Sequence, residues 1–273
     1  MYSLALNEDA LNRILRQLKR FIKARVQCAN ARGAVVALSG GIDSSVVAAL
    51  AHDVVKTKAL ILPEKGVTSE QDMLDATSIA EAYNLSFTII DINDLINCFK
   101  ESAKSILPIH TFDQLSIAEA NLKPRIRMVL NYVASNAEHR LVLGTGNRTE
   151  LLTGYFTKYG DGGVDALPIG GLYKTQVFQL ARYLNIPERI ISKAPSAGLW
   201  LGQTDEEELG ISYSLLDRIL YELMDKKNTV EVTAELLGVE SRQVQEISEQ
   251  VKRAAHKRQA PLIAKIRWTS LSS

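Results

Sequence analysis

The chain has 273 residues, a formal net charge of +1 at pH 7, 46% hydrophobic residues and 23% charged residues. This composition predicts a globular protein with a substantial core, and the near-neutral charge argues against a protein that coats nucleic acid. No apolar run reaches the roughly 18 residues of a membrane span, and the N-terminus mixes acids and bases. Cys28 and Cys98 form no CxxC motif, and we expect them to be small core residues. We therefore expect a cytoplasmic protein with no nucleic-acid or membrane partner.

Apolar residues recur at helical spacing from Leu11 to Ile22, which predicts an amphipathic N-terminal helix. Short apolar runs then predict strands at 34–38, 58–63, 86–90 and 139–144. Helical patterns lie between or before them at 44–55, 69–83, 92–105 and 124–137. Strands alternating with helices predict an α/β fold, with a doubly wound, mainly parallel sheet of the Rossmann-like type and helices on both faces. Ligands of such sheets bind beyond the carboxyl ends of the strands.

The chain after the last predicted strand is different in character. A glycine-rich stretch at 155–171 is typical of a functional loop rather than a flexible linker. Helical patterns follow at 174–184, 212–224, 229–237 and 241–258, and Thr204 with Glu207 predicts a capping box. We expect one domain over 1–273, made of an N-terminal helix (1–30), an α/β nucleotide-binding core (34–200) and a helical C-terminal region (201–273).

The segment SGGIDSS (39–45) follows the first predicted strand and precedes a helix. Gly40 and Gly41 leave backbone N–H groups open to an anion, and a helix that starts near Ser44 adds its positive end. The Walker A pattern GxxxxGK[ST] is absent. Asp43 would repel a phosphate unless a cation accompanies it, so the pattern favours Mg²⁺. The alternative is that Asp43 caps the helix beside a tight turn.

Two later segments also carry charge near predicted helix starts. In NLKPRIRMVLNY, Pro124 is expected at the first helical position, which places Arg125 and Arg127 in the first turn. Arginines there are unfavourable without an anion, so they could clamp a phosphate or carboxylate, or they are surface residues. In GTGNRTE, Glu150 follows a strand and could be a second Mg²⁺ ligand, or simply complement the helix dipole.

The glycine-rich loop carries mixed charges at Lys158, Asp161 and Asp165, and Lys174 follows it. So many glycines make ordering entropically costly, which favours a loop that closes on a ligand. The alternative is a solvated Ω-loop.

SGGIDSS resembles the SGGxDS signature of the ATP pyrophosphatase (PP-loop) superfamily. Its members split ATP between the α and β phosphates and adenylylate a substrate oxygen. GTGNRTE, TKYGDGG, LPIGGLYK, GQTDEEELG and the terminal HKR resemble, in order and at similar spacing, the blocks of the NAD⁺ synthetase family. The resemblance extends from about residue 10 to about residue 260. It implies a fold of the adenine nucleotide alpha hydrolase type.

The resemblance also implies roles for individual residues. It implies ATP contacts from Ala37, Leu38, Ser39, Gly40, Gly41, Ile42, Asp43, Ser44, Ser45, Thr145, Lys174 and Ser196. It implies deamido-NAD⁺ contacts from Arg125, Lys158, Asp165, His256 and Lys257, and Mg²⁺ ligation by Asp43 and Glu150. For the catalytic steps, we expect Lys174 to neutralise departing pyrophosphate and Asp161 to bind ammonium. The family's members are homodimers, so we expect one here.

The implied reaction is the last step of NAD⁺ biosynthesis, in which ATP activates the carboxylate of deamido-NAD⁺ as an acyl adenylate and ammonia displaces AMP. Closure of the loops at 157–165 and 199–206 would exclude water. The short segment before the first strand leads us to expect no amidase domain, so ammonia would come free or from a separate glutaminase. Two alternatives stay open: another PP-loop ligase, GMP-synthetase-like or tRNA-modifying, and an ATP-binding sensor without catalysis.

Overall fold

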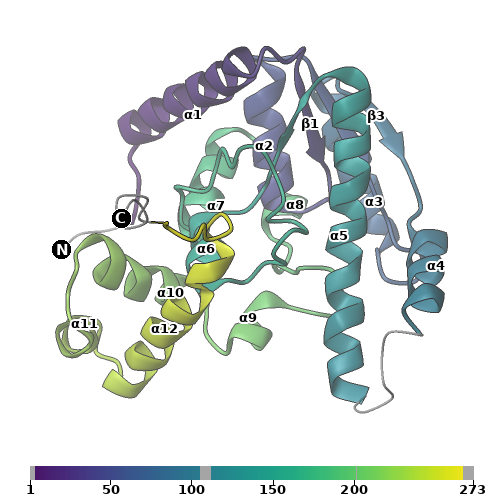
Figure 1. The fold of residues 1–273 in the computed structure, drawn as a ribbon. Helices are drawn as coiled ribbons and strands as arrows, with labels where there is room; N and C mark the ends of the chain where they lie inside the picture. Colours follow the sequence, from purple (N-terminus) through teal and green to yellow (C-terminus); the bar gives the residue numbers. More distant parts are fainter. Residues whose placement is uncertain (1–3, 105–111, 201, 267–273) are drawn as a thin grey trace, which may run out of the picture.

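The computed structural model describes residues 4–104, 112–200 and 202–266 and centres on a parallel sheet (Figure 1). The sheet has four strands in the order β3-β2-β1-β4. They are β1 (Ala34–Ala37), β2 (Thr57–Ile61), β3 (Ser86–Ile89) and β4 (Leu141–Leu143). All three strand pairings are parallel, and Val36 pairs with Ala59 on one side and Leu143 on the other. The predicted parallel sheet is confirmed, and its strand order reverses between β1 and β4.

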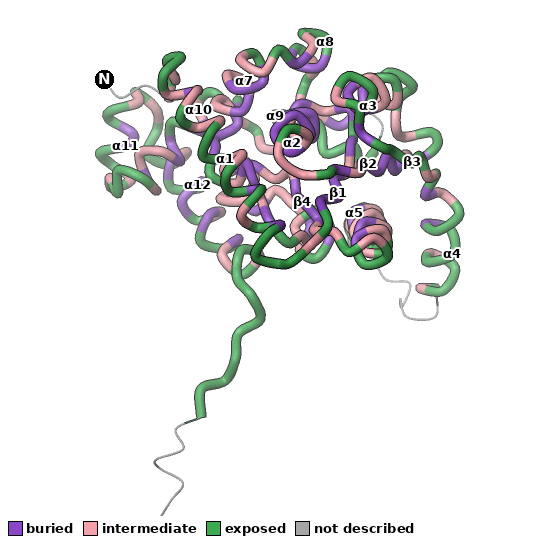
Figure 2. Tube along the Cα trace, turned by 90° about the horizontal axis from the view of Figure 1, so that it is seen from above, coloured by how far each residue is buried: buried purple, intermediate pink, exposed green. Residues whose placement is uncertain are grey.

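Helices cover both faces of the sheet. They are α1 (Glu8–Cys28), α2 (Ile42–His52), α3 (Glu70–Ala82), α4 (Asn93–Ala103), α5 (Phe112–Glu138), α7 (Lys174–Tyr183) and α8 (Glu188–Ile191). The short helix α6 (Arg148–Thr153) packs instead against the helices near the C-terminus. Seen from above, α2 and α3 lie on one face of the sheet and α5 on the other (Figure 2). Successive side chains of β1 divide between these layers, as a strand requires. Val36 packs into the cluster that contains α2 and α7, whereas Val35 packs with Ile126 of α5.

The remaining helices form a separate layer beside the sheet. They are α9 (Asp205–Leu209), α10 (Tyr213–Leu220), the π-helix η1 (Tyr221–Asp225), α11 (Val230–Leu237), α12 (Ser241–Arg253) and the 3₁₀-helix η2 (Ala254–Lys257). Leu216, Ile219 and Val244 are buried in their shared apolar cluster, together with Tyr173 from the start of α7. The predicted helical character of this region is confirmed, while its division from the core at residue 201 stays a prediction. No helix among the described residues combines the length and the apolar character needed to cross a membrane.

The start of α5 differs from the prediction. Pro124 lies inside the helix, so Arg125 and Arg127 lie in its interior and not in a first turn. The residues before Pro124, AEANLK, are mostly good helix formers, and they extend the helix upstream although proline removes one backbone hydrogen bond. The argument that an anion must compensate arginines at a helix N-terminus is therefore wrong.

Two smaller predictions are also wrong. Cys28 and Cys98 are exposed, because one ends α1 and the other lies on the solvent side of α4. Thr204 occupies the N-cap position of α9, but within the described part of the chain its side chain makes no capping hydrogen bond. The N–H of Asp205 donates instead to the carbonyl oxygen of Pro195 at 2.9 Å, so a tertiary contact fixes the helix entry.

Candidate active site

A pocket of about 1100 Å³ opens where β1 and β4 end. Its lining includes Leu38 after β1, Gly144 after β4, residues of α5 and the glycine-rich loop, and the segment that begins at Lys193. The strand order reverses between β1 and β4, so this is the switch point where open parallel sheets bind their ligands.

The loop after β1 holds itself in shape through its own hydroxyl groups. Gly41 is the N-cap of α2 and offers no side chain to the first N–H groups. Ser44 and Ser45 donate from Oγ to the carbonyl oxygen of Gly41 at 3.0 and 2.8 Å, and Ser44 Oγ lies 3.2 Å from Ser39 Oγ. Because Gly41 is the N-cap, the alternative that Asp43 caps the helix is wrong. The positive end of α2 thus faces the pocket without a side-chain cap.

Asn147 joins the two acidic residues that the sequence assigns to a metal. Its Nδ2 donates to Oδ1 of Asp43 at 3.1 Å, and its backbone N–H donates to Oε2 of Glu150 at 3.0 Å. Asn147 and Glu150 also form a capping box at the start of α6. Lys174 Nζ forms an ion pair with Oδ2 of Asp43. Two carboxylates and a lysine from three separate segments therefore meet at one place beside the loop.

A buried aspartate of α10 fixes the segments that carry Glu150 and Lys174. Asp217 accepts from Oγ1 of Thr149 at 2.5 Å and from the N–H of Thr175 at 2.7 Å. Thr149 Oγ1 in turn accepts from the N–H of Lys174 at 3.0 Å. Asp217 thus couples the first turn of α6 to the first turn of α7. It thereby fixes the positions of Glu150 and Lys174 relative to each other.

The electrostatics of this group favour an added cation. Burial, followed by repulsion from Asp43, raises the pKa of Glu150 to about 8. Burial lowers the pKa of Lys174, but attraction to Asp43 and Glu150 outweighs it, so the pKa lies above its usual value. Asp205 lies close enough to interact with these groups, and burial raises its pKa too. Its buried Oδ1 has no hydrogen-bond partner among the described residues. Three carboxyl groups therefore face a single lysine.

The donor set fits Mg²⁺ held jointly with a nucleotide. Among the described residues, no group of three or more His, Cys, Asp or Glu side chains is arranged to hold a metal ion. Mg²⁺ typically uses one or two protein carboxylates and takes its other ligands from waters and substrate phosphates. The oxygen atoms of Asp43 and Glu150 match that requirement, and a divalent ion beside them would favour the ionised form of Glu150, which burial and Asp43 disfavour.

Most residues that the resemblance assigns to ATP line the pocket. They are Ala37, Leu38, Ser39, Gly41, Ile42, Asp43, Ser44, Thr145, Lys174 and Ser196. The remaining two, Gly40 and Ser45, are buried behind it. The backbone of Asp72 covers Gly40, and Ser45 uses its hydroxyl inside the loop. These two residues can shape the loop without reaching the pocket through a side chain.

The residues assigned to deamido-NAD⁺ divide into three places. Arg125 Nη2 donates to the carbonyl oxygen of Lys158 at 3.4 Å, and Lys158 Nζ donates to that of His256 at 2.8 Å. These three residues contact one another outside the pocket lining. Lys257 lines the pocket, where its Nζ donates to two carbonyl oxygens of the segment 154–156 at 2.7 and 2.8 Å. Asp165 instead anchors β4, since its Oδ2 accepts from the N–H of Val142 at 2.8 Å.

Asp161 lies in the pocket wall, and the N–H of Thr157 donates to its Oδ1 at 2.8 Å. The carboxyl group is open to the pocket but has protein on its other sides. The residue as a whole is exposed, but the enclosure of its carboxyl group raises the pKa to about 6, against the hydrogen bond from Thr157 and the charges of Lys257 and Arg127. A carboxylate with that pKa is ionised at neutral pH and can hold a small cation.

Sequence reasoning missed several pocket residues. Asp72, Lys193 and Asp205 all line the pocket, yet the sequence analysis assigned a binding role to none of them. The available signal was weak: Lys193 directly precedes the apolar segment APSAGLW, and Asp205 lies in the block GQTDEEELG, where only Thr204 and Glu207 were given a role, as a helix start. Their positions depend on contacts between distant segments.

Comparisons with known proteins agree with this geometry. The NAD synthase family model matches residues 14–261. The NH₃-dependent NAD⁺ synthetase of Archaeoglobus fulgidus is 48% identical over 258 residues, 93% of this chain and 97% of that protein. That of Methanosarcina mazei is 41% identical, over 95% of this chain and 98% of that protein.

Solved structures give the same result. An NMN synthetase from Francisella tularensis superposes with a TM-score of 0.81 at 35% identity, covering 94% of this chain and 99% of that one. The NH₃-dependent NAD synthetase of Campylobacter jejuni has a TM-score of 0.76 at 29% identity, covering 93% of this chain and 99% of that one. The family match over most of the chain, together with relatives above 40% identity at nearly full length, shows that this chain belongs to the NAD synthase family.

Proposed function

We propose that the protein converts deamido-NAD⁺, ammonia and ATP into NAD⁺, AMP and pyrophosphate. One observation carries the proposal: Asp43, Glu150 and Lys174 converge beside an uncapped helix start at the switch point of the sheet. The relatives named NH₃-dependent NAD⁺ synthetase supply the substrate class.

The pocket supplies what activation of a carboxylate needs. The nicotinate carboxylate attacks the α-phosphorus of ATP, an acyl adenylate forms, and pyrophosphate leaves. The N–H groups at the start of α2 and the ammonium group of Lys174 stabilise the departing negative charge. Asp43 and Glu150 would hold Mg²⁺, which neutralises phosphate charge when it is bound.

Ammonia then attacks the acyl carbon and AMP leaves. Ammonium must first lose a proton. We assign Asp161 to bind the ammonium ion at the pocket wall. The adenylate must be kept from water, which would hydrolyse it. The loop 157–165 and the segment around 199–206 would close over the pocket, although residue 201 lies outside the described residues.

We place deamido-NAD⁺ against Arg125, Lys158, Asp165, His256 and Lys257. The mutual contacts of Arg125, Lys158 and His256 support one shared binding surface.

A second candidate substrate is nicotinic acid mononucleotide, because one similar structure is an NMN synthetase. Both substrates present the same nicotinate carboxylate, so the chemistry of the pocket would be unchanged.

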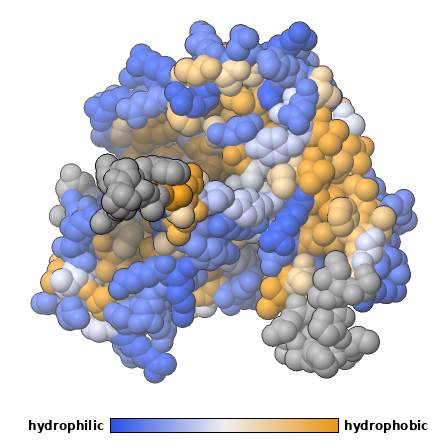
Figure 3. Space-filling view, in the orientation of Figure 1, coloured by the Kyte–Doolittle hydropathy of each residue, from blue (hydrophilic) through white to orange (hydrophobic). Residues whose placement is uncertain are grey.

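We further propose that the protein is a homodimer. Large apolar side chains are exposed on β3, α4 and α5, namely Phe87, Ile89, Leu95, Phe99, Ile117, Val129 and Val133. Figure 3 shows an apolar area over α5. Exposed apolar patches of this kind mark protein interfaces. Arg125, Val129 and Val133 are spaced four residues apart on one helix face, so a second copy there would lie beside the proposed dinucleotide contacts. A cytoplasmic location stays a prediction.

A single assay tests the reaction. The purified protein is incubated with ATP, MgCl₂ and ammonium chloride, together with either deamido-NAD⁺ or nicotinic acid mononucleotide, xanthosine monophosphate or tRNA. We expect AMP and NAD⁺ in the deamido-NAD⁺ sample, with turnover fastest there. AMP formed mainly with the mononucleotide would establish the second candidate. AMP formed only with xanthosine monophosphate or tRNA would indicate another PP-loop ligase. No AMP in any sample would indicate a nucleotide sensor.

A further inference from the structure

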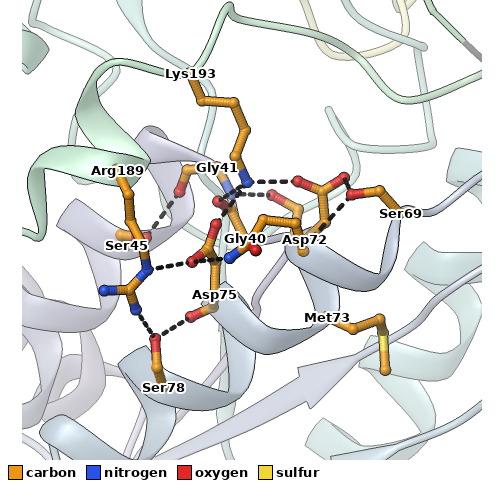
Figure 4. Close-up of polar contacts among 12 residues, drawn as sticks. Gly40, Gly41, Ser45, Ser69, Asp72, Met73, Asp75, Ser78, Arg189 and Lys193 are labelled. Atoms are coloured by element: carbon orange, nitrogen blue, oxygen red, sulfur yellow. Dashed lines mark hydrogen bonds and ion pairs between the residues drawn. The ribbon is translucent and has the colours of Figure 1, made fainter.

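Lys193 lies at the centre of an ion-pair cluster beside the loop that follows β1 (Figure 4). Its Nζ lies 2.6 Å from Oδ1 of Asp72, 2.7 Å from Oδ2 of Asp75 and 3.4 Å from the carbonyl oxygen of Gly40. Lys193 therefore connects three segments: the turn after β1, the first half of α3, and the chain that follows α8. The proposed reaction gives none of these contacts a role.

We propose that Lys193 is a positioning residue that orients the Gly40–Gly41 peptide of the loop for the phosphates of ATP. This rests on the proposed function for the identity of the nucleotide. The carbonyl of Gly40 and the N–H of Gly41 belong to one planar peptide unit and point in opposite directions. The full positive charge of the ammonium group, 3.4 Å from the oxygen on one side, therefore favours the orientation in which the N–H points to the other side. Among the described residues, that N–H has a single, long hydrogen bond of 3.3 Å to Oγ of Ser39, so it can still donate to an anion.

The N-terminal part of α3 presses on the same peptide from the side. Gly40 has φ +80°, and a Cβ at this position would lie 2.3 Å from the backbone oxygen of Asp72. Asp72 is itself fixed, because its N–H donates to Oγ of Ser69 at 3.0 Å and its Oδ2 accepts from that hydroxyl at 2.6 Å. Lys193 thus acts on a peptide that already has little room to move.

A buried carboxylate holds Lys193 in place. The side chain of Asp75 is completely buried, and its Oδ1 accepts from Nε of Arg189 in α8 at 2.7 Å. Burial raises the pKa of Asp75, but the hydrogen bonds from Lys193 and Arg189 outweigh it and leave the pKa below its usual value. An ionised, desolvated Asp75 needs both cations, because losing one leaves an incompletely neutralised buried charge. This fixes the position of the Lys193 ammonium group.

Lys193 also begins the segment that carries Ser196. Lys193, Ala194, Pro195 and Ser196 all line the pocket. Because the Nζ contacts Gly40, the position of this segment and the orientation of the loop are linked through one side chain. We infer that the two are set together when the nucleotide binds.

The test measures nucleotide binding directly. Binding of inorganic pyrophosphate and of a non-hydrolysable ATP analogue, each with MgCl₂, is followed by calorimetry for the wild type, Lys193→Met, Lys193→Arg and the control Arg189→Met. We expect Lys193→Met to lower the affinity for both ligands at least tenfold, and Lys193→Arg to recover most of this lost affinity. Arg189→Met removes a cation from Asp75 without touching Gly40, so it should lower the melting temperature but leave affinity within twofold. Equal affinity losses in the two methionine variants, or none in Lys193→Met, would overturn the inference.

Two further variants keep the test decisive. If Lys193→Met does not fold, Lys193→Gln, which keeps a donor but no charge, is measured in its place against the same thresholds. Asp72→Asn separates positioning from direct phosphate binding. This variant weakens the contact between Asp72 and Lys193. If Lys193 acts through Gly40, the affinity for pyrophosphate should fall. Unchanged or tighter binding would overturn that route. A wild type that binds the nucleotide but makes no NAD⁺ contradicts the proposed function and not this inference.

Discussion

Asp43 and Glu150 are brought together by one residue, Asn147, which donates to both carboxyl groups. The isosteric variants Asp43→Asn and Glu150→Gln keep the shape of the site but remove a charged oxygen ligand. We expect each to slow pyrophosphate release by roughly 10²-fold or more, as loss of a charge-stabilising group does. Release is followed with a coupled pyrophosphate assay.

The same variants should fold normally. Because repulsion and burial disfavour the ionised form of Glu150, the neutral glutamine should leave the melting temperature equal to or above that of the wild type. Near wild-type turnover in both variants would remove the metal assignment from this pair.

Asp161 should produce a pH-dependent signature. Its pKa rises from 3.8 to about 6 in the folded protein, so the protonated form is favoured by folding. The resulting stability is present in full below pH 3.8 and is lost as the pH rises through about 6. We therefore expect the melting temperature of the wild type, relative to Asp161→Asn, to fall between pH 4 and pH 7. Parallel curves for the two proteins over this range would contradict the shift.

The enzymatic activity should also depend on the ionisation of Asp161. If Asp161 holds ammonium as a carboxylate, kcat/KM for ammonium in the wild type should drop as the pH falls through about 6. Asp161→Asn should have a raised KM for ammonium and should lack this step. An unchanged KM for ammonium in the variant would reassign the ammonium site.

Residue types and local order identified the parts of the site that lie next to strand ends. Asp43 and Glu150 lie in the first turns of the helices that follow β1 and β4, so the parallel sheet brings them together without further information. Lys193 and Asp205 could not be found in this way. Their roles come from contacts with Gly40, Asp75 and Tyr213 across distant segments, and the spacing of one sequence does not encode such contacts.

At the scale of elements, the turn after β1 depends on a close approach to α3. Gly40→Ala would place a Cβ 2.3 Å from the Asp72 backbone, so the turn must move. We expect ATP-analogue affinity to fall at least tenfold. Gly66→Ala is the matched control, because Gly66 has a similar φ of +86° but no atom of the described residues lies within 4 Å of an added Cβ. It should cost about 1 kcal/mol of stability through backbone strain and leave affinity unchanged. Equal affinity for the two variants would contradict the close-approach argument.

The helices and strands themselves were predictable because their signal is local. Apolar runs gave β1 to β4 to within a few residues, and helical spacing gave α1, α2 and α3. The start of α5 was not predictable from Pro124, because proline is common at the first position of a helix and rare in a helix interior. The helix formers before it, together with packing of Ile126 against Val35, decide the outcome.

At the scale of the whole molecule, the exposed apolar face of α5 predicts association. Val133 is 60% exposed there, so Val133→Asp should cost little stability in a monomer while opposing an apolar interface. Sedimentation equilibrium at micromolar concentration should show a wild-type dimer and a monomeric variant. Leu236→Asp is the control, because Leu236 is also 60% exposed but lies on α11. A monomeric wild type, or dissociation of both variants, would contradict the proposed interface.

Transfer of a labelled oxygen atom tests the central claim, that ATP activates the substrate carboxylate in this pocket. Deamido-NAD⁺ carrying oxygen-18 in its nicotinate carboxylate is turned over with ATP, MgCl₂ and ammonium, and the products are analysed by mass spectrometry. We predict that one labelled oxygen atom appears in AMP and the other stays in the amide of NAD⁺. Unlabelled AMP, or the release of ADP and phosphate in place of AMP and pyrophosphate, would contradict the account.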